Sequence, residues 1–267
     1  MSVGLEPAAG YLPSGFEATI AGYERFLRGV VESTSDIAAA YKFNLAFFES
    51  LGPGGMSLLE RVRGAMPSDA YVIADAKRGD IGTTAEHYAK ALFGWLGAHA
   101  ATVNPLMGRD SAEPFLAHED RLTFFLVLTS NPGASDFLLH GGLYRRVAES
   151  VASWNARGNC GCVVGATKSE QVAEIRAIAG EMPFLVPGIG AQGGELGATA
   201  RLGRVEAEGF AGMLFHVTRG VLPTGADTGD PFEIVRAKAL GWREAVNVAL
   251  GCRVNHEQKG SGEHVGV

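Results

Sequence analysis

Cysteine is scarce in this sequence, and long apolar runs are missing from it. Only three cysteines occur among 267 residues, at positions 160, 162 and 252. An odd number without a framework of paired spacings is not the pattern of a disulfide-stabilised secreted domain, and it suits the reducing cytoplasm, where we expect the protein to work. No run of about 18 uncharged apolar residues occurs, so no transmembrane helix is expected. The opening segment, MSVGLEPAAG, lacks the basic and apolar regions of a signal peptide.

An excess of basic residues is missing too. Lysine and arginine together number 23 against 29 aspartates and glutamates, which gives a formal net charge of −6. Nothing in this balance attracts a polyanion, so we predict neither a nucleic-acid partner nor an anionic membrane surface. A few local cations can still hold a small anionic substrate.

Several catalytic motifs are absent as well. The Gly-Leu-Glu-Pro turn after the first predicted strand is not a GxGxxG dinucleotide fingerprint, and no GxSxG nucleophile elbow occurs. The seven histidines show neither HExxH nor any other paired spacing, so no metal site is expected.

What the sequence does contain is a regular alternation of strand-like and helix-like segments. Such alternation predicts a parallel sheet with helices outside it, and the number of units matches a single (β/α)8 TIM barrel, with an open doubly wound sheet as the alternative. We predict a barrel domain over residues 1–250 and a disordered, polar tail over 251–267. The expected strands are Val3–Glu6, Ala40–Asn44, Tyr71–Lys77, Ala101–Asn104, Thr123–Thr129, Cys160–Gly165, Phe184–Pro187 and Gly212–Val217. The expected helices are Ala18–Ala39, Met56–Ala65, Thr84–Leu96, Ser111–Ala117, Leu143–Ala156, Ser169–Ala179, Thr199–Glu208 and Pro231–Val248.

The third predicted strand carries the most informative charges. Side chains alternate along a strand, so Asp75 and Lys77 are expected to point together into the mouth of the barrel, where such folds keep their active sites. Asp80 follows three residues later, at the start of the next helix. A structural ion pair with an aspartate helix cap is the alternative interpretation of these three residues.

Two neighbouring strands extend this pattern. Lys42 and Asn44 share one face of the second predicted strand, and the first predicted strand ends in Glu6. Glu6, Lys42, Asp75 and Lys77 are thus predicted to form an array of alternating charge. Alternation matters because a lysine keeps its charge in a desolvated site only when carboxylates offset the cost.

Two late segments favour phosphate binding. A glycine-rich segment that contains Gly190 and Gln192 follows the seventh predicted strand, and Arg219 follows the eighth. Loops after these two strands form the usual phosphate site of such barrels, because glycines expose backbone N–H groups and an arginine can bind two phosphate oxygens. After the fifth strand, Thr129 and Ser130 could hydrogen-bond a polar ring, although a simple turn is nearly as good an interpretation.

These motifs resemble one known family. The segment from Ala74 to Thr84, ADAKRGDIGTT, is similar to the DxKxxD signature of the orotidine 5'-phosphate decarboxylases, and reads most like their second bacterial subgroup. Further similarity comes, in the same order, from AFFE at 46–49, TSNP at 129–132, VGAT at 164–167 and VPGIGAQGG at 186–194. The resemblance extends from Val3 to about Leu222.

The resemblance implies a cofactor-free carboxy-lyase that converts orotidine 5'-phosphate into uridine 5'-phosphate and CO2, the last step of de novo UMP synthesis. Lys77 would protonate C6 of the pyrimidine, within a charged network that includes Asp75 and Lys42. Asp80, Ile81 and Thr84 would enter the active site of the partner subunit, so a homodimer is implied. Gln192 and Arg219 would hold the 5'-phosphate, Lys42 and Asn44 would face the ribose, and Thr129 and Ser130 would lie near the pyrimidine.

The sequence also departs from the family pattern. Glu6 stands where the first strand usually ends in Asp, Phe43 follows Lys42 where proline is usual, and His216, Val217 and Thr218 replace a serine-rich approach to the arginine. Glu6 and His216 keep open a paralogous lyase that acts on another pyrimidine nucleotide. Two further alternatives are a sugar-phosphate lyase of the same superfamily, whose acidic metal-binding pattern is not evident here, and a nucleotide-binding protein without turnover.

Overall fold

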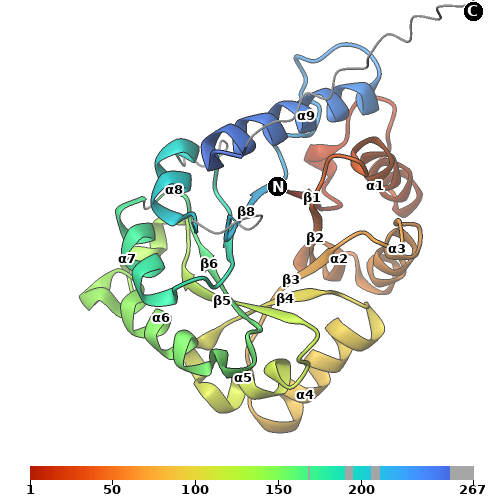
Figure 1. The fold of residues 1–267 in the computed structure, drawn as a ribbon. Helices are drawn as coiled ribbons and strands as arrows, with labels where there is room; N and C mark the ends of the chain where they lie inside the picture. Colours follow the sequence, from red (N-terminus) through yellow and green to blue (C-terminus); the bar gives the residue numbers. More distant parts are fainter. Residues whose placement is uncertain (168, 190–194, 206–210, 253–267) are drawn as a thin grey trace, which may run out of the picture.

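The computed structural model describes residues 1–167, 169–189, 195–205 and 211–252. Within them, parallel strands close into a barrel in the order β1 to β8, and helices surround it (Figure 1). The predicted (β/α)8 barrel is therefore confirmed, and the open doubly wound sheet is excluded. The strands are β1 (Ser2–Leu5), β2 (Ala40–Asn44), β3 (Val72–Arg78), β4 (Ala100–Val103), β5 (Leu122–Leu128), β6 (Cys160–Val164), β7 (Phe184–Val186) and β8 (Met213–Val217).

The helices outside the barrel follow the predicted order. The α-helices are α1 (Ile20–Thr34), α2 (Leu45–Glu49), α3 (Gly52–Gly64), α4 (Gly82–Ala89), α5 (Arg109–Leu116), α6 (Leu143–Trp154), α7 (Ser169–Ala179), α8 (Leu196–Gly203) and α9 (Pro231–Leu250). The short α2 was not predicted, and α4 continues as a π-helical segment, η2 (Lys90–Trp95). Short 3-10 turns are η1 (Ala9–Tyr11), η3 (Pro105–Met107), η4 (Pro132–Ser135), η5 (His140–Gly142) and η6 (Asn155–Arg157).

Three predicted helix boundaries are wrong by several residues. The helix predicted over 18–39 ends at Thr34, where the chain turns and the backbone N–H of Ile37 donates to the Thr34 carbonyl. The helix predicted from Met56 begins at Gly52, because Pro53 has its φ preset for the first turn. The helix predicted over 199–208 runs from Leu196 to Gly203; residues 206–210 lie outside the described residues.

The inside of the barrel changes from apolar to polar along the strands. An apolar cluster of Ala40, Ile73, Ala100, Phe124, Val163 and Leu185 fills the lower interior. Two residues further along β2, β3 and β4, Lys42, Asp75 and Thr102 are buried polar residues, and on β8 the buried His216 follows Leu214, which packs against the cluster. The outer faces of the strands pack on the helices in a second, larger apolar cluster. Because the apolar layer closes the barrel from below, the polar layer can be reached only from the carboxyl ends of the strands.

Arg176 on α7 ties the later elements together. Its guanidinium donates to four backbone carbonyls and lies 3.5 Å from the ring centroid of Phe184. The four acceptors are the carbonyls of Gly203 (2.7 Å), Gly180 (2.6 Å), Met182 (2.7 Å) and Gly212 (3.0 Å). Burial lowers the pKa of Arg176 to about 10. This arginine therefore fixes α7 against the segments that lead into β7 and β8.

The described part of the chain ends just after α9. Asp230 caps this helix by accepting the backbone N–H groups of Phe232 (2.8 Å) and Glu233 (3.0 Å), and Gly251 ends it with φ of 72°. Of the tail predicted over 251–267, residues 253–267 lie outside the described residues. No helix among the described residues combines the length and the apolarity needed to cross a membrane.

Candidate active site

A pocket of about 510 Å³ opens at the carboxyl ends of the strands. This volume lies within the range of small-molecule sites. Its wall contains most of the residues that the sequence singles out, because parallel strands bring their carboxyl ends to one rim of the barrel. The polar lining residues are Glu6, Lys42, Asn44, Asp75, Lys77, Thr102, Thr129, Ser130, Asn131, His216, Thr218 and Arg219.

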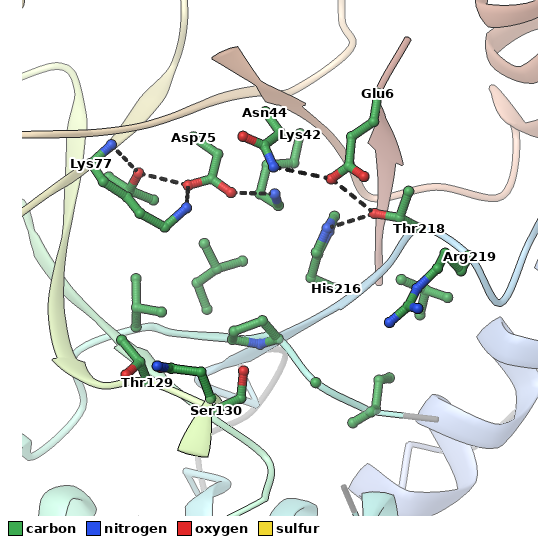
Figure 2. A pocket seen from close by; sticks show the side chains of 18 of the residues that line it. Glu6, Lys42, Asn44, Asp75, Lys77, Thr129, Ser130, His216, Thr218 and Arg219 are labelled. Atoms are coloured by element: carbon green, nitrogen blue, oxygen red, sulfur yellow. Dashed lines mark hydrogen bonds and ion pairs between the residues drawn. The ribbon is translucent and has the colours of Figure 1, made fainter. Parts of the chain in front are cut away.

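Asp75 lies between two lysines at the centre of this wall (Figure 2). Its Oδ2 accepts from Nζ of Lys42, and its Oδ1 accepts from Nζ of Lys77 at 2.5 Å. The Lys42 and Asp75 side chains are 5% and 9% exposed, whereas that of Lys77 is 50% exposed. Burial alone would raise the pKa of Asp75, but the charges of Lys42 and Lys77 outweigh burial and hold it well below its usual range. Asp75 is therefore an anion that holds the half-exposed Lys77 side chain at the pocket surface.

The backbone at Lys77 departs from the regular strand geometry in which side chains alternate between two faces. Lys77 has φ of 46° and is the only non-glycine residue with positive φ in the described part of the chain. The pairing of β3 with β4 shifts register between Ala74 and Arg78. A non-glycine residue in this conformation costs about 1–2 kcal/mol. The side chain of Lys77 reaches Asp75 through this irregularity, and not because residues 75 and 77 share a regular strand face.

Thr102 on β4 connects the two residues, and the sequence reasoning missed it. Its Oγ1 accepts from the backbone N–H of Lys77 at 3.0 Å and donates to Oδ1 of Asp75 at 2.9 Å. The residue is 1% exposed. A polar residue inside an otherwise apolar strand, two positions after Ala100, was the signal that could have identified it.

Glu6 joins the pocket by hydrogen bonds and not through the predicted charge array. β1 ends at Leu5, so Glu6 follows the strand directly. Its Oε1 accepts from Nδ2 of Asn44 at 3.4 Å and from Oγ1 of Thr218 at 3.5 Å. None of the ion pairs formed by the described residues includes Glu6, so the confirmed array consists of Lys42, Asp75 and Lys77.

His216 lies below Thr218 and completes a chain of hydrogen bonds. Its Nε2 is 3.1 Å from Oγ1 of Thr218, and its Nδ1 is 2.9 Å from Oγ of Ser2. Because Thr218 gives its one hydroxyl proton to Glu6, His216 must donate through Nε2 and accept from Ser2 at Nδ1. This is a neutral tautomer. Burial, and then the charge of Lys42, lower the pKa of His216 well below its ordinary value, which agrees with that tautomer.

Arg219 occupies another part of the pocket, in the turn after β8 (Figure 2). Its guanidinium is exposed and has no carboxylate partner among the described residues, so it is available to an anion. The next carbonyl, that of Gly220, accepts from Nε1 of Trp242 on α9 at 3.1 Å, which anchors this turn. Pro187, Gly188 and Ile189 also line the pocket. The predicted phosphate ligands Gly190 and Gln192 lie outside the described residues.

Thr129 and Ser130 face Asp75 and Lys77 from the other side of the pocket (Figure 2). A close approach fixes this segment, because a Cβ on Gly165 would lie 2.7 Å from the Ser130 backbone nitrogen. The Oγ1 of Thr167 also donates to the Ser130 carbonyl at 3.1 Å. The segment directly after β6 therefore holds these two residues in place across the pocket from Lys77.

Asp80, Ile81 and Thr84 do not line the pocket of their own chain. Oδ1 of Asp80 accepts from the backbone N–H of Ile81 at 2.8 Å, and α4 begins only at Gly82. Ile81 and Thr84 are exposed. The structure thus separates these three residues from the other candidates. Among the described residues, no group of three or more histidine, cysteine or acidic side chains is arranged to hold a metal ion.

Comparison with known proteins assigns the family. The model of the orotidine 5'-phosphate decarboxylase / HUMPS family matches residues 20–230. The chain belongs to this family. An orotidine 5'-phosphate decarboxylase of Azoarcus sp. is 44% identical over 255 residues, which cover 92% of this chain and 93% of that protein. An orotidine 5'-phosphate decarboxylase of Roseiflexus sp. is 44% identical over 260 residues, which cover 95% of this chain and 94% of that protein. The solved structure of an OMP decarboxylase of Leishmania donovani is 41% identical and has a TM-score of 0.80. The match covers 94% of this chain and 93% of that chain.

Membership of the orotidine 5'-phosphate decarboxylase / HUMPS family confirms the resemblance inferred from the motifs. The departures noted in the sequence are also visible as structure. Glu6, Thr218 and His216 form one connected wall of the pocket, separate from the Lys42, Asp75 and Lys77 ion pairs.

Proposed function

We propose that this protein decarboxylates orotidine 5'-phosphate to uridine 5'-phosphate and CO2 without a cofactor, as a step of pyrimidine nucleotide synthesis. The observation that carries the proposal is the half-exposed ammonium of Lys77, held by the buried and ionised Asp75 in a pocket that also contains Arg219. The named relatives, at 44% identity, support the same reaction.

The chemistry requires a cation next to one carbon atom. Loss of CO2 breaks the bond between C6 and the carboxylate and leaves the electron pair on C6, where the ring delocalises it poorly. A fixed ammonium group beside C6 stabilises this charge more in the transition state than in the bound substrate, which is the condition for acceleration. Lys77 then transfers a proton to C6 as a general acid.

The neighbours of Lys77 keep this arrangement ready before the substrate binds. Asp75 accepts from Lys42 with one carboxylate oxygen and from Lys77 with the other, so both ammonium groups are held in place before the reaction begins. Charges that are already oriented need no reorganisation during the reaction. Lys42 and Asn44 face the ribose, and Thr129 and Ser130 lie near the pyrimidine ring. In this way a single carboxylate orients the catalytic lysine and a lysine on the ribose side.

The phosphate group supplies binding energy away from the reacting carbon. Arg219 and the segment with Gly190 and Gln192 hold the phosphate, and backbone N–H groups of the glycines add hydrogen bonds. Binding energy from a remote group can order the reacting end of the site, so loss of the phosphate should lower turnover as well as affinity.

The proposal includes a cytoplasmic homodimer in which Asp80, Ile81 and Thr84 reach the partner's site. Two observations support it. The loops after β3 and β4 leave the barrel side by side, since the backbone N–H of Asn104 donates to the Arg78 carbonyl at 2.8 Å. On these loops the apolar side chains of Ile81 (55%), Leu106 (56%) and Met107 (49%) are exposed.

Mixing inactive variants tests the shared site. Lys77→Ala and Asp80→Asn each inactivate the homodimer, but a mixed dimer has one site with both residues intact. Random mixing of equal amounts should therefore restore about a quarter of the wild-type activity, by the statistics of a two-fold dimer. No recovery after verified subunit exchange contradicts the sharing of Asp80. A monomer in sedimentation at the assay concentration contradicts the dimer.

One assay decides the function. Purified protein is incubated with orotidine 5'-phosphate, with release of CO2 and formation of uridine 5'-phosphate measured together. Turnover that yields both products in equal amounts supports the proposal. Turnover only of a different pyrimidine nucleotide points to a paralogous lyase, which the connected wall of Glu6, Thr218 and His216 would favour. Tight binding without products points to a nucleotide-binding protein.

A further inference from the structure

The hydroxyl of Thr102 is placed between the backbone of Lys77 and the carboxylate of Asp75. A hydroxyl group carries one proton, and the backbone nitrogen of Lys77 can only donate. The proton of Thr102 must therefore point at Oδ1 of Asp75, 2.9 Å away, while Oγ1 accepts from Lys77 at 3.0 Å. Both hydrogen-bonding directions of the side chain are thus fixed by the two residues of the ion pair.

The irregular backbone makes this hydroxyl necessary. Between Ala74 and Arg78 the register of β3 against β4 shifts, so the N–H of Lys77 donates to a side chain of β4. Lys77 also has the left-handed conformation that residues other than glycine rarely adopt. Such a conformation persists only when the surroundings hold it in place.

The identity of the residue fits this task. A β-branched side chain has few χ1 rotamers, so the hydroxyl has a defined position even without a ligand. Thr102 is 1% exposed, and water therefore does not compete for either partner. Oδ1 of Asp75 also accepts from Nζ of Lys77 at 2.5 Å, so the hydroxyl and the ammonium meet on the same oxygen atom.

We propose that Thr102 is a positioning residue, whose hydroxyl holds the backbone of Lys77 in its left-handed conformation and fixes the Asp75 carboxylate that orients the Lys77 ammonium. The inference rests on the proposed decarboxylation, because it assigns a catalytic consequence to this placement. Without the hydroxyl, the Lys77 N–H and one Asp75 oxygen each lose a partner, and the ammonium group is no longer held at one place. A small misplacement of a catalytic group is enough to reduce the rate strongly.

The competing interpretation is a buried threonine whose hydroxyl only satisfies hydrogen bonds in the core. Thr123 on β5 offers a matched control, since it is also fully buried and its Oγ1 has no hydrogen-bond partner. Thr102→Val and Thr123→Val are the same isosteric exchange in neighbouring strands. Only the first removes a hydroxyl that contacts the ion pair.

The experiment compares kcat and KM for orotidine 5'-phosphate, and the Kd of uridine 5'-phosphate, among wild type, Thr102→Val, Thr102→Ser and Thr123→Val. We expect Thr102→Val to lower kcat by roughly 10–100-fold with the Kd within about threefold, because positioning acts on the transition state. Thr102→Ser restores the hydroxyl and should recover most of kcat. Thr123→Val should behave as wild type. An unchanged kcat in Thr102→Val, or a serine variant as slow as the valine variant, overturns the proposal.

Two additions keep the outcome decisive. If Thr102→Val does not fold, Thr102→Cys and Thr102→Ala replace it, and the weak S–H donor should give Thr102→Cys a kcat between those of wild type and Thr102→Ala. If wild-type protein does not decarboxylate orotidine 5'-phosphate, the proposed function fails, but crystal structures of wild type and Thr102→Val still test the positioning. A wild-type Lys77 with positive φ that becomes negative in the variant supports it, and an unchanged Lys77 overturns it.

Discussion

Lys42 and Asp75 form an ion pair inside the barrel, and their side chains are only 5% and 9% exposed. The ammonium group of Lys42 makes no other hydrogen bond or ion pair with the described residues, so its charge depends on this one carboxylate. Replacing such a pair by apolar residues is often harmless, whereas removing one partner leaves a buried and uncompensated charge. Each residue of the pair is therefore needed for stability as long as the other is present.

The first prediction concerns stability. Asp75→Asn should lower the free energy of unfolding by about 3 kcal/mol, because it leaves Lys42 buried without a counter-charge and beside Lys77. Denaturation by urea measures this value. The double variant Lys42→Met/Asp75→Asn should regain part of the loss, since no charge stays buried. An Asp75→Asn variant as stable as wild type contradicts this account of the pair.

The second prediction concerns the phosphate. Arg219→Gln removes a charged donor that is worth about 1.5–3 kcal/mol, so the KM for orotidine 5'-phosphate should rise roughly 10–100-fold. Orotidine, which has no phosphate, is the matched substrate, and its kcat/KM should be the same in variant and wild type. Steady-state kinetics with both substrates checks this. Equal losses for nucleotide and nucleoside would place the role of Arg219 elsewhere.

The third prediction concerns pH. The folded protein holds the pKa of His216 well below 6.5, so below about pH 6.5 the unfolded chain binds a proton that the folded chain does not. As the pH is lowered below 6.5, this residue should reduce the free energy of unfolding by about 1.4 kcal/mol per pH unit. Above pH 6.5 it should make no contribution to the pH dependence. Burial also lowers the pKa of His99, which steepens the fall in every variant.

His216→Asn isolates the contribution of His216. Urea denaturation at pH 7.5 and pH 5.0 should show a smaller loss in the variant than in wild type, by up to about 2 kcal/mol. Because His99 is present in both proteins, the difference between them reports on His216 alone. Equal losses would mean that the imidazole is protonated in the folded protein, and the tautomer assigned from Ser2 and Thr218 would then be wrong.

Much of the fold was predictable because the apolar strands of a parallel barrel are separated by amphipathic helices. The limits of β2 and α7 were predicted to the residue. The start of α3 was missed because its first residues are glycine and proline, which read as a loop although they occupy a helix N-terminus. The short α2 is a single turn fixed by the packing of Phe48, and a sequence window cannot detect it.

The candidate site was predictable where charged residues interrupt an apolar strand, as at Lys42, Asp75 and Lys77. It was not predictable where a side chain of one strand hydrogen-bonds the functional residues of the next strand. Thr102 has no charge and belongs to an apolar strand, and its role depends on a register shift between β3 and β4. Glu6 was predicted to join the charge array because it ends the first predicted strand, whereas its carboxylate accepts from Asn44 on β2 and from Thr218, which follows β8. Contacts of this kind depend on how the strands pair, which a single strand's sequence does not reveal.

The central claim is that the ammonium of Lys77 makes the reaction possible while the rest of the pocket binds the nucleotide. It is tested most directly by the kcat of Lys77→Ala for orotidine 5'-phosphate, measured beside the Kd of uridine 5'-phosphate by calorimetry. Lys90→Ala, at an exposed lysine outside the pocket, is the control. We expect kcat to fall by about 10⁴-fold or more, since one group supplies both charge stabilisation and the proton, while the Kd changes by less than about tenfold. A Lys77→Ala variant that keeps a tenth of the wild-type kcat would contradict the claim.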